Sequence, residues 1–195
     1  MTVLPGAAGA LGAAGAPGSA AALADLVLPD DDGLSHRLGD AWLIRPVVLA
    51  FLRHFGCLFC RRRAAELVAR RADIIAAGAG LAVVGLGTPA FAKAFREDAG
   101  WRGPIYVDAE AKAYAAAGLV RAGPLRLLRP RVLLAAVRAR KQGFRQGKTQ
   151  GDPWQMGGTL VVAPRDRVVY AWRNASAEDD APVDEVLAAV RGLVD

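Results

Sequence analysis

The sequence predicts an α/β fold in which helices flank a central mixed β-sheet, and three observations lead to this fold class. Two continuous apolar runs, RPVVLAFLR (Arg45 to Arg53) and LAVVGLG (Leu81 to Gly87), have the pattern of strands buried on both faces. Between them, apolar residues recur at helical spacing. Strand, helix and strand within about 40 residues form a βαβ unit with parallel strands. Near the C-terminus, GGTLVVAPRDRVVYAWRN contains two β-rich runs joined by APRD, which predicts an antiparallel hairpin.

The helix of the βαβ unit is predicted over Cys60 to Ala77, and its two faces differ in character. One face gathers apolar residues and the other gathers most of the charged ones. We expect the first to lie on the sheet: Ala64, Leu67, Val68, Ile74 and Ile75. We expect the second to face solvent: Arg62, Arg63, Glu66 and Arg70.

The other elements follow in chain order. LADLVLPDDDGLSHRL reads as a short strand and a turn that contains Gly33. Thr88 as N-cap and Pro89 in the first turn predict a helix over TPAFAKAFREDAG. PIYVD is a short strand, and AEAKAYAAAG is a short helix that ends at Gly118. Two further helices are expected, one starting near Pro130 and one over PVDEVLAAVRGLV.

Length and composition favour one globular domain. The 195 residues are 53% hydrophobic and 23% charged, and we assign residues 24–195 to the domain. Residues 1–23 are rich in Ala and Gly and lack a basic leader segment, so we expect a flexible tail rather than a signal peptide. No apolar run reaches the length of a membrane span, and two cysteines do not make a disulfide scaffold. We therefore expect a cytoplasmic protein without a membrane partner.

The only two cysteines, Cys57 and Cys60, lie in HFGCLFC, where the first predicted strand ends and the helix begins. The amide groups and positive dipole of a helix N-terminus stabilise a thiolate, which predicts Cys57 as an exposed nucleophile and Cys60 as its resolving partner. Two other interpretations remain: a pair of inert buried cysteines, or half of a zinc site. Since His36 and His54 lie at no recognised ligand spacing from the pair, we expect no metal.

Charged neighbours flank the cysteines. Arg53 and Arg61 would stabilise a thiolate or bind an anionic substrate, or would be ordinary surface arginines. His54 would donate or accept a proton beside Cys57, or would be a loop histidine bonded to the backbone.

One segment makes the chain basic. Residues 111–151 contain ten Lys or Arg and no Asp or Glu, leaving 15 basic against 19 acidic groups elsewhere. The segment would be a solvated helix face, an electropositive rim that attracts anionic substrates, or a nucleic-acid site. Because no RNA-binding aromatic signature and no helix-turn-helix pattern accompany it, we do not expect a nucleic-acid partner.

Four stretches together resemble the peroxiredoxin-like 2 group of the AhpC/TSA, thioredoxin-fold superfamily: VVLAFLRHFGCLFCRRRAAEL, GLG, YVDAEAKAYAAAGL and QGDPWQMGGTLVV. The resemblance covers about Ala24 to Val190 and implies a thioredoxin-like fold in a peroxiredoxin-like arrangement. It also implies thiol-dependent reduction of peroxides or other oxidised small molecules, with no metal or organic cofactor. Cys57 would become a sulfenic acid, Cys60 would condense with it to a disulfide, and a thioredoxin- or glutathione-type donor would reduce the disulfide.

The chain departs from the family pattern at three positions. Typical peroxiredoxins have a proline seven residues and a threonine three residues before the peroxidatic cysteine, where this chain has Ala50 and His54. Thioredoxins have a cis-proline before the strand that faces the active site, whereas here Gly158 precedes Thr159. Glycine at that position would let backbone or substrate approach closely.

Two alternative functions stay open. One is a thiol–disulfide reductase acting on protein disulfides, and the other is a non-catalytic binding domain that uses residues 111–151. The sequence predicts no oligomeric state.

Overall fold

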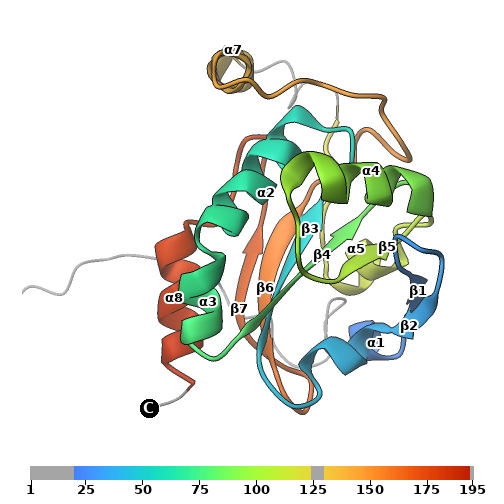
Figure 1. Cartoon of the computed structure of the whole chain (residues 1–195), viewed down its shortest axis with the longest axis vertical. Coiled ribbons are helices and arrows are strands. Elements are labelled where there is room, and N and C mark those ends of the chain that lie inside the picture. The colour runs from blue at the N-terminus through green and yellow to red at the C-terminus, as the bar shows by residue number, and fades with distance from the viewer. Residues whose placement is uncertain (1–19, 124–129, 194–195) are drawn as a thin grey trace, which may run out of the picture.

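The computed structural model describes residues 20–123 and 130–193, and it confirms an α/β fold (Figure 1). Its helices are α1 (Ala20–Ala24), α2 (Leu58–Ala69), α3 (Arg71–Ala76), α4 (Pro89–Ala99), α5 (Lys112–Ala116), α7 (Pro130–Lys141) and α8 (Val183–Arg191), with a 3-10 helix η1 (Leu38–Trp42). Its strands are β1 (Val27–Pro29), β2 (Ser35–Arg37), β3 (Val47–Leu52), β4 (Gly80–Gly85), β5 (Ile105–Val107), β6 (Gly158–Ala163) and β7 (Arg167–Arg173).

The central sheet has five strands in the order β5-β4-β3-β6-β7. β3, β4 and β5 are parallel, whereas β6 and β7 run antiparallel to their neighbours, so the predicted mixed sheet and its C-terminal hairpin are confirmed. β3 lies in the middle, and all six of its residues are buried. This burial explains why its sequence is an uninterrupted apolar run.

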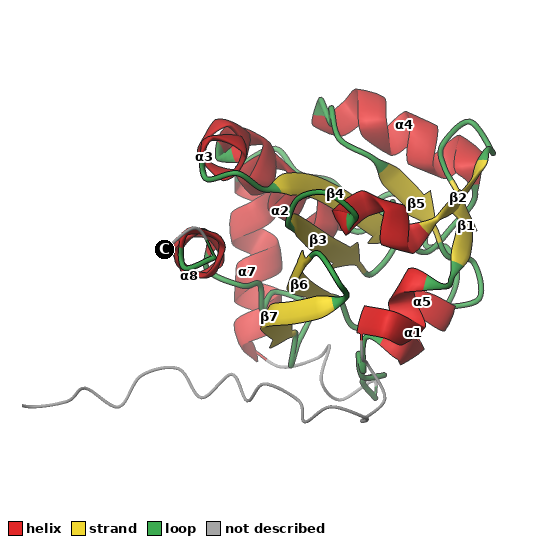
Figure 2. Ribbon diagram, turned by 90° about the horizontal axis from the view of Figure 1, so that it is seen from below, coloured by secondary structure: helices red, strands yellow, loops and turns green. Residues whose placement is uncertain are grey.

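Helices cover both faces of the sheet, which gives three layers (Figure 2). One core lies between the sheet and α2, α3, α4 and α8, with α7 packed against α2 at its edge, and it includes both cysteines. A second core lies between the other face and α1, η1 and α5, where the large side chains Trp42 and Tyr114 are fully buried. Within the described parts of the chain, no helix combines the length and the apolar character needed to cross a membrane.

The helix predicted over Cys60 to Ala77 is two helices, because α2 begins at Leu58 and the helical backbone is interrupted at Arg70. No glycine or proline lies at this interruption, and tertiary contacts are made at and just after it. The Arg70 guanidinium pairs with Asp184 at the start of α8, while Ile74 is fully buried.

Two residues of this region lie on the opposite face from the one expected. Arg63 is 3% exposed, whereas Ile75 is 36% exposed. The guanidinium of the buried Arg63 has two polar partners, the half-exposed Glu66 carboxylate and the buried hydroxyl of Thr159. Ile75 is displaced from the core by the change of direction at Arg70.

The folded part begins before residue 24. Residues 20–23, which the sequence assigned to the tail, belong to α1, and Leu23 is fully buried in the second core. The rest of the predicted tail lies outside the described residues, as do Arg126 and Arg129 of the basic segment. The domain assignment itself stays a prediction.

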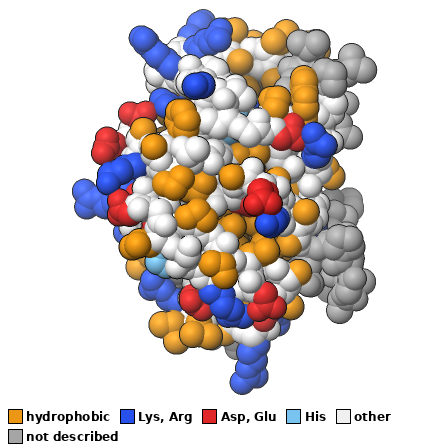
Figure 3. Space-filling model, turned by 90° about the vertical axis from the view of Figure 1, so that its right-hand side faces the viewer, with side chains coloured by type: hydrophobic (Ala, Val, Ile, Leu, Met, Phe, Trp, Pro, Cys, Tyr) orange, Lys and Arg blue, Asp and Glu red, His pale blue; other side chains and the backbone are white. Residues whose placement is uncertain are grey.

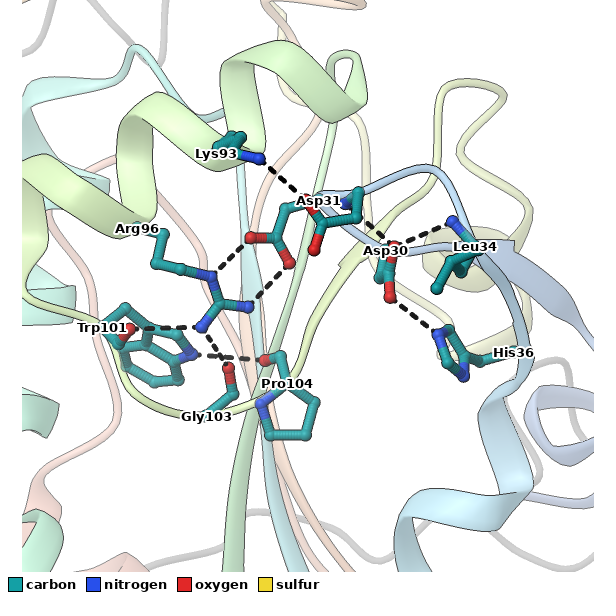
Figure 4. Close-up of polar contacts among 10 residues, drawn as sticks. Asp30, Asp31, Leu34, His36, Lys93, Arg96, Trp101, Gly103 and Pro104 are labelled. Carbon is teal, nitrogen blue, oxygen red and sulfur yellow. Dashed lines mark hydrogen bonds and ion pairs between the residues drawn. The ribbon is translucent and has the colours of Figure 1, made fainter.

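The aspartate-rich turn between β1 and β2 anchors α4 (Figure 4). The Asp31 carboxylate accepts two hydrogen bonds from Arg96 of α4, and Asp32 pairs with Lys93 one helical turn earlier. Arg96 also donates to two carbonyls in the loop that follows α4. The turn therefore positions the helix that lies beside α2.

Candidate active site

Cys57 is the N-cap residue of α2 and follows a short loop from the end of β3, as the sequence predicts. The Cys57 N–H donates to the His54 carbonyl at 3.1 Å, which closes this loop into a turn. Gly56 is required in the turn, since a Cβ atom there would lie 2.2 Å from the Lys148 carbonyl oxygen. The Gly147 N–H also donates to the Gly56 carbonyl at 2.8 Å, so the segment after α7 lies directly over the cysteine loop.

Both cysteines are free thiols and both are buried, with Cys57 2% and Cys60 5% exposed. The sequence-based expectation of an exposed Cys57 is therefore wrong. The physical cause is the covering segment: Gly147 and Lys148 occupy the space above Gly56 that a bare helix N-terminus would leave to solvent.

The N-terminus of α2 is capped by a residue distant in sequence. The Gln146 side-chain oxygen accepts a hydrogen bond from the Leu58 N–H at 3.1 Å, whereas the Cys57 side chain makes no capping bond. The amides of Phe59 and Cys60 remain to stabilise the Cys57 sulfur. Gln146 lies 88 residues further along the chain, and no local spacing signalled this contact.

The pKa values of the two thiols are shifted in opposite directions. A hydrogen bond from the Cys60 thiol lowers the pKa of Cys57 to about 6, and the Arg53 charge and the Phe59 and Cys60 amides add to this effect against the opposing effect of burial. Burial raises the pKa of Cys60 well above its ordinary value, and the adjacent Cys57 raises it further. At neutral pH, Cys57 is thus the thiolate and Cys60 the thiol.

Arg53 is the cation beside the thiolate. Its Nη1 donates to the Cys57 sulfur at 3.8 Å, and its backbone N–H donates to the Cys60 sulfur at 3.1 Å. Carbonyl groups of Pro153 and Gln155 accept from the other guanidinium nitrogens and fix the side chain, which is 8% exposed. A buried guanidinium held in this way is a permanent positive charge directed at Cys57.

Arg61 lies elsewhere. Its guanidinium pairs with Asp98 of α4 at 3.0 Å, beside a surface pocket of about 370 Å³ between α2, α4 and the segment after α7. The structure therefore groups Arg53 with the thiols and directs Arg61 to α4.

His54 is buried, being 3% exposed, and its Nδ1 has no hydrogen-bond partner in the described part of the chain. Burial, together with the adjacent Arg53 charge, lowers the pKa of His54 to about 4. The imidazole is therefore neutral at pH 7. Its backbone carbonyl, rather than its ring, contacts the Cys57 amide.

Gly158 and Thr159 begin β6, opposite Phe51 and Ala50 of β3. A Cβ atom on Gly158 would lie 2.6 Å from the Trp172 carbonyl oxygen, which explains glycine there. β3, β6 and α2 contribute residues to the lining of a small cavity of about 10 Å³. The lining includes Ala50, Arg53, Cys60, Gly158 and Thr159. Gly158 and Thr159 thus lie with Arg53 on the Cys60 side of the pair.

Several polar residues near the thiols were missed by sequence reasoning. Arg63, Asn174 and Asp180 line the same cavity behind Cys60. For Arg63 a signal existed, because it lies three residues after Cys60 on a helix whose buried stripe continues to Leu67. Asn174 and Asp180 lie in the irregular segment between β7 and α8, which carries no periodicity to interpret.

Ion pairs neutralise part of the positive charge of the basic segment, residues 111–151. Lys112, Arg121 and Arg131 each pair with an acidic side chain outside it: Glu110, Asp152 and Glu178. The last turn of α7 carries Arg138, Arg140 and Lys141, and all three side chains are exposed, whereas Ala139 between them is buried. α7 lies at the end of the molecule from which α2 begins (Figure 1), and Figure 3 shows Lys and Arg side chains gathered at that end.

Among the described residues, no group of three His, Cys, Asp or Glu side chains is arranged to hold a metal ion. The chemistry available at the site is that of two thiols, one guanidinium and backbone amides.

Comparison with known proteins adds an independent line of evidence. The family model for the AhpC/TSA antioxidant enzyme matches residues 66–176, a range that begins after the two cysteines. The chain is 33% identical over 161 residues to a chloroplastic thioredoxin-like protein of Arabidopsis thaliana. The match covers 78% of this chain and 64% of the Arabidopsis protein. It is 33% identical over 170 residues to the prostamide/prostaglandin F synthase of Salmo salar, with 84% of each chain covered. It is 29% identical over 185 residues to peroxiredoxin-like 2C of Mus musculus, with 88% and 80% covered.

Solved structures share the fold. Peroxidoxin BcpB from Mycobacterium tuberculosis superimposes with a TM-score of 0.64 at 19% identity, covering 88% of this chain and 94% of the other. Peroxiredoxin Q of Xanthomonas campestris gives a TM-score of 0.64 at 20% identity, with 90% and 95% covered. The predicted thioredoxin-like fold in a peroxiredoxin-like arrangement is confirmed.

Proposed function

Because the chain belongs to the AhpC/TSA antioxidant enzyme family, we propose that it is a thiol oxidoreductase that reduces peroxides through Cys57 and Cys60. The observation that carries this proposal is the asymmetry of the two thiols. Arg53 and the Cys60 thiol act on Cys57, whose pKa is lowered to about 6, while burial raises the pKa of Cys60. A nucleophilic thiolate next to a protonated thiol is the arrangement that a peroxidatic and a resolving cysteine require.

The first step is attack of the Cys57 thiolate on one oxygen of the peroxide. A sulfur–oxygen bond forms, the O–O bond breaks, and the departing alkoxide or hydroxide takes a proton to leave as alcohol or water. Cys57 becomes a sulfenic acid. The Arg53 guanidinium, 3.8 Å from the sulfur, is the group placed to stabilise the negative charge of the attacking thiolate.

In the second step Cys60 loses its proton and attacks the Cys57 sulfur. The S–S bond forms, the sulfenic S–O bond breaks, and the hydroxide leaves as water after protonation. One dithiol donor of thioredoxin type, or two thiols of glutathione type, then reduce the disulfide by thiol–disulfide exchange and are themselves oxidised to a disulfide. Because both sulfurs are buried, the donor reaches them only when the segment around Gly147 moves off Gly56.

Gly158 and Thr159 contribute on the Cys60 side. The bare Gly158 backbone permits the close approach of β6 and β7, and the Thr159 hydroxyl accepts a hydrogen bond from Arg63 at 3.4 Å. We assign these two residues to holding the wall behind Cys60 rather than to binding the peroxide.

The test is peroxide consumption by the wild type, Cys57→Ser and Cys60→Ser with a thioredoxin system supplied. We expect no turnover for Cys57→Ser, and a single turnover without recycling for Cys60→Ser. Mass spectrometry of the oxidised wild type should show the loss of two hydrogens that an internal disulfide produces.

Two outcomes would contradict the proposal. Turnover by Cys57→Ser at the wild-type rate would remove the assigned nucleophile. Reduction of an added protein disulfide without any consumption of peroxide would instead identify a thiol–disulfide reductase.

A further inference from the structure

A small cavity lies behind Cys60, between β3, β6, the first turns of α2 and the segment that precedes α8. Its volume of about 10 Å³ is close to that needed for one water molecule. Arg63 and Asn174 line it, and each has a buried atom without a hydrogen-bond partner in the described part of the chain, Nε and Oδ1 respectively. A donor and an acceptor of this kind at one small cavity are what a single bridging water satisfies.

Asp180 lies between this cavity and the surface. It lines the cavity together with Cys60, and it also lines an open surface pocket of about 330 Å³ next to α2. Its carboxylate accepts hydrogen bonds from Arg62 at 2.8 Å and from the Asn174 amide at 3.3 Å, which fix its orientation. Asp180 is thus the carboxylate that borders both the interior behind Cys60 and bulk solvent.

We propose that Asp180 is a proton-relay residue that, through a water in this cavity, accepts the proton of the Cys60 thiol and returns it when the disulfide is reduced. The proposal rests on the function assigned above, in which Cys60 must lose a proton to form the disulfide. The Cys60 proton passes by way of the cavity water to the Asp180 carboxylate, and from there to solvent in the surface pocket. When a donor thiol attacks Cys57, the departing Cys60 thiolate regains a proton along the same route.

The charges around Asp180 suit this task. Burial raises its pKa, Arg63 and Arg62 oppose the rise, and Glu66 adds to it. Glu178 lines the surface pocket as well, but its carboxylate pairs with Arg131 of α7 at 3.1 Å. Burial makes Cys60 a weak acid, so a base within reach of its proton is needed for its attack at neutral pH.

The alternative role for Asp180 is purely structural, as the ion-pair partner of Arg62 that holds the segment before α8. The two roles predict different effects of removing the Asp180 charge on the rate of disulfide formation. Removing a nearby negative charge makes Cys60 more acidic, so a structural Asp180 would leave disulfide formation unchanged or faster. A relay would make it slower.

The experiment uses rapid mixing of the full-length reduced chain with peroxide, followed by acid quench and mass spectrometry, across a range of pH. Sulfenic acid and disulfide are counted separately. For Asp180→Asn we expect sulfenic acid formation within about twofold of wild type, and disulfide formation about 100-fold slower at pH 7, as for loss of a general base. The slow rate should rise with pH, since hydroxide replaces the missing carboxylate. Asp180→Glu should restore most of the rate and the wild-type pH profile.

Glu178→Gln is the matched control, because it removes a neighbouring paired carboxylate from the surface pocket but not from the cavity. An unchanged disulfide rate and pH profile in Asp180→Asn would overturn the relay, and so would an equal slowing in Glu178→Gln. Thermal unfolding of each variant separates these effects from loss of the fold.

A second oxidant separates failure of the relay from failure of the proposed function. Diamide, an azo oxidant, adds to the Cys57 thiolate and is then displaced as the hydrazine by Cys60, which must lose the same proton. If peroxide fails to react but diamide produces the disulfide about 100-fold more slowly in Asp180→Asn, the relay stands and the peroxidase assignment falls. If both oxidants give the disulfide at the wild-type rate in Asp180→Asn, the relay alone falls.

Discussion

Replacing Arg53 by methionine should remove the charge that keeps Cys57 ionised. The guanidinium Nη1 lies 3.8 Å from the Cys57 sulfur, in a site where both groups are buried. Two unit charges at this distance interact by about 1 kcal/mol at the dielectric constant of water and by about 4 kcal/mol at the effective value of 20 that suits proteins. The acid dissociation constant of Cys57 should therefore fall between about fivefold and about a thousandfold.

The expected consequence at pH 7 follows from the thiolate fraction. With the pKa lowered to about 6, roughly nine tenths of Cys57 is thiolate at this pH. A hundredfold fall in the dissociation constant leaves roughly one tenth, so the rate of attack on peroxide should drop about tenfold. The midpoint of ionisation should move upward toward the ordinary thiol value.

The assay is a titration of thiolate ultraviolet absorbance in the Cys60→Ser background, where one thiol absorbs and the serine hydroxyl still donates to it. Because absorbance needs no reagent to enter, the burial of Cys57 does not limit the measurement. Arg61→Met is the matched control, since Arg61 pairs with Asp98 instead. An unmoved midpoint in Arg53→Met, or an equal movement in Arg61→Met, would refute the electrostatic assignment.

Three further results are expected. The pKa of His54 is lowered from 6.5 to about 4, so the contribution of the neutral imidazole to folding stability is complete above pH 6.5 and is lost as pH falls toward 4. Between pH 7.5 and pH 5, the free energy of unfolding measured in urea should therefore fall by about 2 kcal/mol less in His54→Leu than in wild type. Gly56→Ala should lower the midpoint of thermal unfolding by the equivalent of about 1 to 3 kcal/mol, because the new Cβ meets a backbone carbonyl of the covering segment. Replacing Arg138, Arg140 and Lys141 of α7 by glutamine should slow reaction with an anionic peroxide several-fold at low salt and leave hydrogen peroxide unaffected in a stopped-flow comparison.

Each of these results has a clear contrary outcome. Equal pH dependence of stability in wild type and the histidine variant would mean that the imidazole titrates normally. Gly123→Ala is the control for the glycine substitution, since a Cβ there meets nothing within 4 Å among residues 20–123 and 130–193. Equal destabilisation by both substitutions would remove the steric argument. Identical slowing of charged and neutral peroxides would exclude steering by α7.

The fold was predictable where burial alone decides the residue pattern. β3 and β4 lie inside the sheet, so every residue is apolar or small and the strands are visible in the sequence. The interruption between α2 and α3 was not, because no residue at Arg70 disfavours a helix locally and its partner Asp184 is 114 residues away.

The site was predictable to the extent that its geometry is local. The position of Cys57 follows from the junction of a strand with a helix, both visible in the sequence. The groups that set its acidity are not local: the carbonyls of Pro153 and Gln155, which fix Arg53, come from about 100 residues later. Their path depends on the packing of the whole chain, which no periodicity encodes.

The covering segment has a consequence for the protein while it is being made. Residues 146–155 supply the cap on α2, the contact with Gly56 and the carbonyls that fix Arg53. They leave the ribosome about 90 residues after the cysteines, which at usual elongation rates is roughly 5 to 20 s. During this interval the nascent thiols lack both their cover and the two carbonyls that fix Arg53 beside Cys57. The chain thus acquires its reactive sulfur only when synthesis has delivered the segment that shields it.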